Sequence, residues 1–543
     1  MVAATSTDKP WLVQKYGGTS LGKLANTICG SIIPDYARNH RLVVVCSALS
    51  GNLKANGTTS LLLECIALAE AGIEAQKQLI EAVHLIRENH LGILDSIFSA
   101  QGVVSEVEVY DVTKSAIVRE CENLTKFLLA AQVVGDLSPR SRDRIISLGE
   151  KLACIVIAAC LTSKGIPARP VVLDDVVAAA FGPSVDEQIA AMEKLGSRFY
   201  RVLAEEIATR IDDCHGAIPI VTGFFGIMPN SLIQTVGRGY SDLCAALCAV
   251  AVGAAELQIW KEVDGIFTAD PRKIPSAQLL SSVTADEATE LTYYGSEVIH
   301  PLTMDQICEA NIALRLKNVF KPHGQGTVID PSTPAPSLGM GQISRNMVSP
   351  PGVLLKNDFS VGRFERRRPT AVTVKDDILL INVICNRYIK SGGLLIQVFQ
   401  RLERNKIPVD LIATSERNVS LAVHSPGNMS AVMRLQEELQ SFGKVAIAKN
   451  MSIVTIVGNK MRSHSGVAND TLTALAAANV NIHLISQGAS EISISLVVNA
   501  DDATSALNAI HREVLKIPTL EESRFRRSKF FSCPPSNPES REC

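Results

Sequence analysis

The sequence has no marked excess of charge and no long apolar run. Its 53 basic and 55 acidic side chains give a formal net charge of −2 and a pI near 6.6. We therefore expect no nucleic-acid partner and no general attraction to an anionic membrane. The longest apolar segment, residues 243–257, is rich in alanine and too short to span a bilayer comfortably. It is typical of a buried helix.

The sequence also lacks a secretory signal and a metal-binding pattern of cysteines. The 13 cysteines are scattered, and Cys244 and Cys248 stand one helical turn apart with no companion His/Cys pair, which favours core packing over metal or redox chemistry. An odd number of cysteines without a secretory signal favours a reducing cytosol. About ten residues precede the first expected strand and include Asp8, so we expect a cytoplasmic protein without a transit peptide.

Residues 13–20, VQKYGGTS, have the outline of an anion-binding site. Residues 11–16 read as a strand and a helix can follow from residue 21, so amide groups between them would face a phosphate. Paired glycines would let the phosphate approach, a lysine would neutralise it, and a hydroxyl would cap the helix or contact substrate. The residues concerned are Lys15, Gly17, Gly18, Thr19 and Ser20.

Two alternatives exist for this segment. Gly17, Gly22 and Lys23 have Walker spacing, but Leu24 stands where that loop needs a magnesium-binding Ser or Thr. We therefore assign the phosphate contact to Lys15. The second alternative, if the segment is considered alone, is that the two glycines form only a turn with no binding function.

Four further segments follow in an order that resembles the aspartate kinases of the amino acid kinase family, and most of all the fungal enzymes with this single activity. With residues 15–20 they are residues 45–48, 147–150, 236–242 and 260–272, and together they cover most of residues 10–320. The resemblance implies an α/β, carbamate kinase-like three-layer domain. The alternation of β-like and helical runs in this half agrees with that fold class.

The resemblance also implies two neighbouring pockets. Arg238 would hold the substrate carboxylate with its planar guanidinium group, and Glu150 would hold the α-amino group. Asp242, the second catalytic residue, would position Lys15. Without the resemblance, Asp242 reads as a helix cap. Further substrate contacts are implied at Thr19, Ser20, Ser47, Phe224 and Ser241. ATP, with Mg²⁺, is implied at Gly17, Gly18, Lys261, Glu262, Val263, Phe267 and Arg272, with no metal ligands assigned in the protein.

Three features depart from this pattern or add nothing to it. Glu297 stands where many family members have a phosphate-facing lysine, so we exclude it from the site. We interpret His300 as a structural hydrogen-bonding residue. Residues 58–137 read as mainly helical, either as a lid or dimer surface or as a solvated helical hairpin.

Prolines and glycines after Lys321 mark a linker. We expect a catalytic domain over residues 9–345, a linker over 346–370, two regulatory domains over 371–448 and 449–517, and a disordered tail over 518–543. The two regulatory domains follow from an internal repeat, because Gly393 and Gly466 (466 − 393 = 73) begin matching stretches and the same offset relates Asp410 to His483.

The repeat resembles paired ferredoxin-like ACT domains, which bind small regulatory molecules in amino acid biosynthetic enzymes. The resemblance implies effector contacts at Ser391, Gly393, Val409, Asp410, Ser415, Glu416 and Gln487. It also implies a homo-oligomer, because ACT domains pair.

Together these features predict an ATP:L-aspartate 4-phosphotransferase that makes 4-phospho-L-aspartate for threonine, methionine and isoleucine synthesis. Feedback by threonine is the regulation that the resemblance implies. The alternatives are another amino acid kinase, acting on glutamate or acetylglutamate, and a non-catalytic amino acid sensor.

Overall fold

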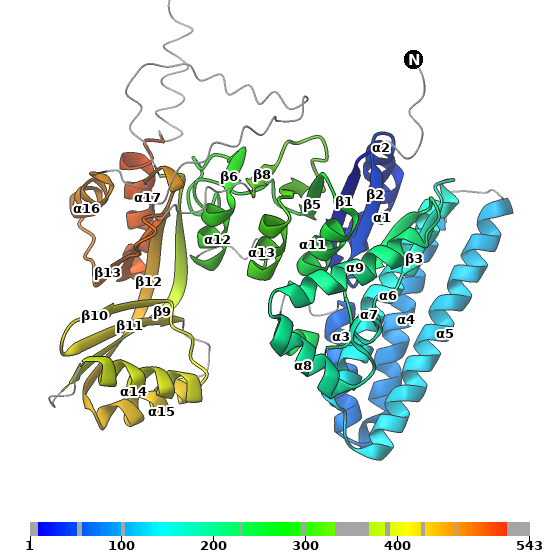
Figure 1. Ribbon diagram of the computed structural model, residues 1–543, viewed down its shortest axis with the longest axis horizontal. Coiled ribbons are helices and arrows are strands. Elements are labelled where there is room, and N and C mark those ends of the chain that lie inside the picture. The colour runs from blue at the N-terminus through cyan, green and yellow to red at the C-terminus, as the bar shows by residue number, and fades with distance from the viewer. Residues whose placement is uncertain are drawn as a thin grey trace, which may run out of the picture. The chain divides into compact units, whose positions relative to one another are not determined.

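The computed structural model describes residues 9–50, 57–98, 104–228, 231–237, 239–294, 299–331, 369–385, 391–424, 429–461 and 465–517, which form two compact units (Figure 1). The first unit contains the described residues up to 266, residues 280–285 and the described residues between 299 and 331. The second contains residues 267–279, 286–294 and the described residues from 369 onward. The predicted tail, and all of the predicted linker except residues 369 and 370, lie outside the described residues.

The first unit is built on an eight-stranded sheet with the order β3-β4-β2-β1-β5-β7-β8-β6. All neighbouring strands are parallel except β7 and β8. Five of the six residues of the central strand β1 are buried, as expected for a parallel strand covered on both faces. The strands are β1 Trp11–Tyr16, β2 Arg41–Cys46, β3 Ala168–Val171, β4 Ile218–Thr222, β5 Glu256–Lys261, β6 Ser282–Thr284, β7 Ala313–Asn318 and β8 Thr327–Asp330.

The first unit also contains helices. They are α1 Gly18–Thr27, the π-helix η2 Ile28–Ile32, α2 Ile33–Ala37, α3 Thr58–Glu70, the 3₁₀ turn η4 Ile73–Ala75, α4 Gln76–Phe98, α5 Val104–Val134, α6 Pro139–Ser163, α7 Val176–Phe181, α8 Val185–Leu195, α9 Arg198–Asp212, α10 Leu232–Thr235, α11 Tyr240–Val252 and α13 Pro301–Glu309. The mainly helical stretch predicted over residues 58–137 is thus α3 to α5. Leu62, Leu79 and Leu128 from these helices share one apolar cluster with Leu152 of α6, so one face of the stretch packs in the core of the first unit.

The two most buried helices are α6 and α11. Among the described residues, α6 is the one helix long and apolar enough to cross a bilayer, but 83% of its apolar stretch is buried inside the protein. Helix α11 carries Cys244 and Cys248, both fully buried with free thiols. This confirms that these two cysteines pack in the core.

The second unit contains a six-stranded antiparallel sheet with the order β10-β11-β9-β12-β14-β13. Its strands are β9 Ala371–Cys385, β10 Leu411–Thr414, β11 Asn418–His424, β12 Gly443–Val457, β13 Leu484–Gln487 and β14 Ser493–Asn499. Its helices are α14 Ser391–Arg404, α15 Met429–Gln440, α16 Val467–Ala477 and α17 Ala503–Glu513, with 3₁₀ turns η5 Asn459–Met461 and η6 Ala500–Asp502; most of α12 (Ala285–Tyr294) also belongs to this unit.

The strand order is symmetric about the β9–β12 pair, as an internal repeat requires. Strands β10 and β13 occupy equivalent edges and begin 73 residues apart, at Leu411 and Leu484. Both central strands are 15 residues long and run through both halves of the sheet. Residues 371–375 of β9 pair with residues 453–457 of β12, so they complete the second half, although the repeat places them in the first regulatory domain.

Residues 267–279 join the second unit because of their apolar side chains. Ala269 and Ile274 pack into the same cluster as Val454 and Leu475. The sequence places this segment in the catalytic domain, whereas its core lies with the second half of the repeat.

Candidate active site

The predicted catalytic residues meet at the carboxyl ends of β1, β2, β4 and β5. Strand β1 lies between β2, the next strand along the chain, and β5, and it is parallel to both. Ligands bind at such switch points in open α/β sheets, outside the carboxyl ends of the strands. The first unit therefore has one natural place for a substrate pocket, and the motifs lie there.

Lys15 and Asp242 form a buried ion pair at this edge. Lys15 Nζ lies 2.6 Å from Asp242 Oδ1, and Lys261 Nζ lies 3.9 Å from Oδ2. Burial alone would raise the pKa of Asp242, but the charges of Lys15 and Lys261 outweigh it and hold this pKa below its ordinary value. The site thus presents two amines around one ionised carboxylate, a net positive charge suited to a phosphoryl group.

Helix α1 begins at Gly18, three residues after Lys15 and earlier than the helix expected from residue 21. Gly17 is its N-cap residue, and the amide groups of the next residues have no partner within the helix. A Cβ at Gly18 would lie 2.0 Å from the Ala48 carbonyl oxygen, whereas a Cβ at Gly17 would meet nothing within 4 Å. Gly18 therefore packs the helix start against the loop after β2, and Gly17 leaves open space beside Lys15.

This contrast gives a prediction. Gly18→Ala should destabilise the protein by about 1–3 kcal/mol, because the new methyl group overlaps backbone that cannot move freely, while Gly17→Ala should leave stability within about 0.5 kcal/mol of wild type. Urea unfolding of both variants measures the difference. Equal midpoints would contradict the packing role of Gly18.

Serine hydroxyls link the neighbouring strand ends. Ser20 Oγ donates to Glu262 Oε1 at 2.8 Å, and Ser47 Oγ donates to Ser241 Oγ at 3.0 Å. These contacts bring together residues that the resemblance assigns to the substrate pocket and to the nucleotide pocket. Thr19 is half-buried at the second position of α1, whereas Lys23 of the Walker-like spacing is exposed.

Glu150 is a buried carboxylate in α6. The Tyr240 hydroxyl donates to Glu150 Oε1 at 2.7 Å, and the Tyr240 ring meets Phe224 edge-on at 5.9 Å between centroids. Glu150 Oε2 is buried with no hydrogen-bond partner among the described residues. Burial raises the pKa of Glu150 to about 7, against the opposing hydrogen bond from Tyr240. An ammonium group beside Oε2 would satisfy this atom.

Tyr240 is the residue that the motifs failed to indicate as functional. Helix α11 begins at Tyr240 with Gly239 as its N-cap residue in the left-handed conformation. Asp242 is therefore inside the first turn, and the alternative reading of Asp242 as a helix cap is wrong. Tyr240 lies between Gly239 and Ser241, inside the 236–242 segment, and this position could have indicated it as a site residue.

The remaining predicted nucleotide contacts are more exposed. Val263 is 51% exposed. Phe267 and Arg272 belong to the second unit, and the Arg272 guanidinium pairs with Asp270 at 2.8 Å. Their assignment stays a prediction, as does that of Arg238, which lies outside the described residues together with Glu297.

His300 has the structural role predicted for it. Its Nδ1 accepts from the Leu302 amide at 3.2 Å, so Nε2 carries the proton and donates to the Val236 carbonyl at 3.0 Å. Both ring nitrogens are committed to backbone groups. His300 therefore anchors the start of α13.

In the second unit, Asp410 is the most buried of the predicted effector residues whose side chains are described. Its side chain is 4% exposed, and Lys375 Nζ lies 2.5 Å from Oδ1. Asp410 Oδ2 is buried without a hydrogen-bond partner among the described residues. The neighbouring Val409 carbonyl accepts from the Tyr293 hydroxyl at 3.3 Å.

The other predicted effector residues lie in helix starts and turns. Ser391 and Gly393 are in the first turn of α14. Ser415 Oγ accepts from the Asn418 amide at 3.3 Å, and Glu416 is exposed in the same turn. Gln487 is exposed at the end of β13. Their roles stay predictions.

Comparison with known proteins agrees with this architecture. Residues 10–318 match the amino acid kinase family, and residues 454–514 match an ACT domain. The chain is 41% identical to an aspartokinase of Saccharomyces cerevisiae over 534 residues, covering 96% of both chains. Two structures of E. coli aspartokinase III, each 25% identical, cover 93% of this chain and 99% of theirs. One holds aspartate and ADP, with a TM-score of 0.61, and the other holds lysine and aspartate, with a TM-score of 0.67.

Proposed function

Because the chain belongs to the amino acid kinase family and, within it, to the aspartokinases, we propose that it transfers the γ-phosphoryl group of ATP to the side-chain carboxylate of L-aspartate. The products are 4-phospho-L-aspartate and ADP. The observation that carries this proposal is the buried pair of Lys15 and Asp242, with the half-buried Lys261 beside it, at the carboxyl ends of the central strands.

The reaction needs positioning and charge rather than a base. The attacking carboxylate is ionised near neutral pH, so no proton has to be removed from it. Lys15 stabilises negative charge on the transferring group, and Asp242 fixes the Lys15 ammonium 2.6 Å away. Glu150 binds the α-amino group of aspartate through its free Oε2 atom, which sets the direction of the attack.

Magnesium fits this site as a companion of the nucleotide. The described residues contain no group of three or more side chains that could hold a metal ion by themselves. Magnesium commonly binds through substrate phosphates and only one or two carboxylates, so such a group is not required. When bound, the ion supplies further neutralisation of phosphate charge.

An ATP-dependent hydroxamate assay with aspartate, glutamate and acetylglutamate tests the substrate. We expect aspartyl hydroxamate from wild type and none without ATP. Turnover of glutamate or acetylglutamate in preference to aspartate would favour the alternative amino acid kinase. No turnover of any substrate, together with amino acid binding, would favour a sensor.

We also propose that the second unit binds an amino acid effector, with threonine as the first candidate. We further propose that the product supplies threonine, methionine and isoleucine synthesis. The protein would act in the cytoplasm as a homo-oligomer. Lysine is the rival effector, since one E. coli structure similar to this chain holds lysine. Separate titration of the two amino acids in the kinase assay distinguishes them.

Asp410 gives the sharpest test of the effector site. Asp410→Asn should raise the threonine concentration for half-inhibition at least about tenfold, since a hydrogen bond to a charged group contributes about 1.5–3 kcal/mol. Activity without effector should stay near wild type. His483→Ala, at the equivalent exposed position of the second half, is the matched control. Unchanged inhibition of Asp410→Asn, with aspartate relieving it completely, would place threonine in the substrate pocket instead.

A further inference from the structure

Asp143 is a buried carboxylate of α6 that is not part of the predicted site. Its side chain is fully buried, and both of its oxygens accept hydrogen bonds. Ser231 Oγ donates to Oδ1 at 2.6 Å, and the Leu232 amide donates to Oδ2 at 2.8 Å. We propose that Asp143 is a positioning residue for the amino acid substrate, which fixes residues 231–236 and, through them, the start of α11. This inference rests on the proposed function, because the substrate is the aspartate assigned there.

The backbone that Asp143 holds has an unfavourable conformation. Ser231 has a φ angle of 69°, in the left-handed region that residues other than glycine seldom adopt. Such a conformation persists only where its surroundings fix it, and it is common beside active sites. Asp143 fixes it twice, through the Ser231 hydroxyl and through the first amide of α10. Because α10 is only four residues long, it is too short to be stable by itself, and its place depends on this carboxylate.

His300 holds the other end of the same segment. Its Nε2 donates to the Val236 carbonyl at 3.0 Å. Gly239 has a φ angle of 97°, and a Cβ there would lie 3.2 Å from the His300 Cβ. Helix α11 begins at the next residue, Tyr240. The chain that leads into α11 is therefore fixed at Ser231 by one contact and at Val236 and Gly239 by another.

Helix α6 holds both flanks of the 236–242 segment. Asp143 and Glu150 are seven residues apart (150 − 143 = 7), about two turns, so they lie on the same face of α6. Asp143 accepts from Ser231 before the segment, and Glu150 accepts from Tyr240 within it at 2.7 Å. Since Glu150 is the proposed ligand of the α-amino group, one helix face sets where this ligand lies relative to the start of α11.

The first residues of α11 belong to the substrate pocket. Ser47 Oγ donates to Ser241 Oγ at 3.0 Å, and Asp242 is one half of the catalytic ion pair. Residues 241–249 are all buried, so packing holds the helix itself. Loss of Asp143 should therefore displace the chain before α11 and leave the ion pair in place. The effect should appear in the binding of aspartate rather than in phosphoryl transfer.

Steady-state kinetics of the full chain in the hydroxamate assay test this role. Asp143→Asn leaves an acceptor for only one of the two donors. Ser231→Ala removes the hydroxyl donor alone. Thr235→Val is its matched control, because it removes a hydroxyl of the same short helix that donates to the Ser231 carbonyl at 2.8 Å instead.

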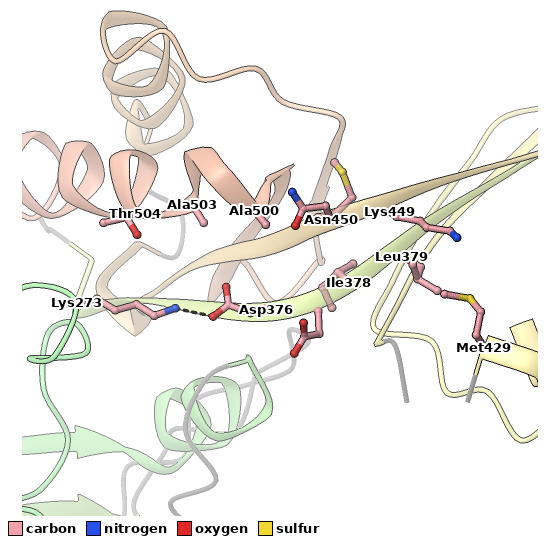
Figure 2. A pocket seen from close by; sticks show the side chains of 12 residues that line it. Lys273, Asp376, Ile378, Leu379, Met429, Lys449, Asn450, Ala500, Ala503 and Thr504 are labelled. Atoms are coloured by element: carbon pink, nitrogen blue, oxygen red, sulfur yellow. Dashed lines mark hydrogen bonds and ion pairs between the residues drawn. The ribbon is translucent and has the colours of Figure 1, made fainter. Parts of the chain in front are cut away.

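Asp376→Asn is the matched control for the loss of a carboxylate. Asp376 lies beside a cavity of the second unit, and both of its oxygens are engaged (Figure 2). Lys273 Nζ lies 2.6 Å from one oxygen, and Ser452 Oγ donates to the other at 3.0 Å. The variant therefore removes a charge of the same kind without touching α6.

We expect the KM for aspartate to rise about 10- to 100-fold in Asp143→Asn and in Ser231→Ala, with kcat and the KM for ATP within about threefold of wild type, because a small displacement of a substrate contact has effects of this size. The two substitutions break one shared hydrogen bond, so the double variant should be no worse than the more affected single variant. Thr235→Val and Asp376→Asn should keep the wild-type KM for aspartate.

Thermal unfolding of every variant shows whether the fold is kept, and Ser231→Ala decides if Asp143→Asn does not fold. A wild-type KM for aspartate in either variant that folds would overturn the role of Asp143. So would an equal rise in both KM values, or a rise of the same size in either control. Absence of aspartate turnover by wild type would overturn the proposed function itself, and the role of Asp143 with it.

Discussion

Replacing Lys15 with alanine is expected to lower turnover about 100- to 1,000-fold, because a positioned positive charge at the developing phosphoryl charge contributes about 3–4 kcal/mol to the transition state. The effect should fall on kcat, since Lys15 acts on charge that develops during transfer. Lys23→Ala, which removes an exposed lysine eight residues on, is the matched control. It should leave turnover unchanged.

The Lys15 variant also needs a control for stability. Removing one partner of a buried ion pair costs about 3–5 kcal/mol when the other charge is left uncompensated, although Lys261 at 3.9 Å still compensates part of the Asp242 charge. The double variant Lys15→Met/Asp242→Asn removes both buried charges and should recover stability but not turnover. Near-normal turnover in Lys15→Ala, or recovery of turnover in the double variant, would contradict the role of Lys15.

The sequence predicts the centre of this site well because its motifs sit at strand ends. Once residues 11–16 form a parallel strand at a switch point, Lys15 must lie at the edge where other strands end. The placement of Lys15 depends on a local strand–turn–helix unit, which a short motif encodes. Its pairing with Asp242 is instead implied by the family resemblance, because the local pattern alone indicates a helix cap at Asp242.

Other contacts could not be predicted because they depend on tertiary packing. The hydrogen bond from Tyr240 to Glu150 joins residues 90 apart, and the raised pKa of Glu150 results from burial that no local pattern reports. Likewise, the repeat predicts two similar halves but not that β9 passes through both. The pairing of residues 371–375 with 453–457 is a matter of register across the sheet.

Glu150 gives the second large effect, which depends on pH. The carboxylate can hold an ammonium group only when ionised, so kcat/KM for aspartate should fall about tenfold per unit below pH 7, the pKa of the free enzyme's group. Glu150→Gln should flatten this slope and raise the KM for aspartate about 10- to 100-fold, since a hydrogen bond to a charged group contributes about 1.5–3 kcal/mol. The KM for ATP should barely change.

The titration of Glu150 should also affect the stability of the protein, but in the opposite direction. The free energy of unfolding should fall as the pH rises, whereas kcat/KM increases. The pKa of Glu150 is about 7 in the folded protein and near its ordinary value of 4.5 in the unfolded chain, so between these pH values the folded state holds a proton that the unfolded state has lost. Raising the pH from 4.5 to 7 therefore lowers the free energy of unfolding, by about 3 kcal/mol in all, with no further loss above pH 7. Glu150→Gln should lack this loss, whereas Glu122→Gln, at an exposed position of α5, should retain it. Urea unfolding from pH 4.5 to 8 measures the difference between variants, and parallel profiles for wild type and Glu150→Gln would show that Glu150 does not titrate in this range.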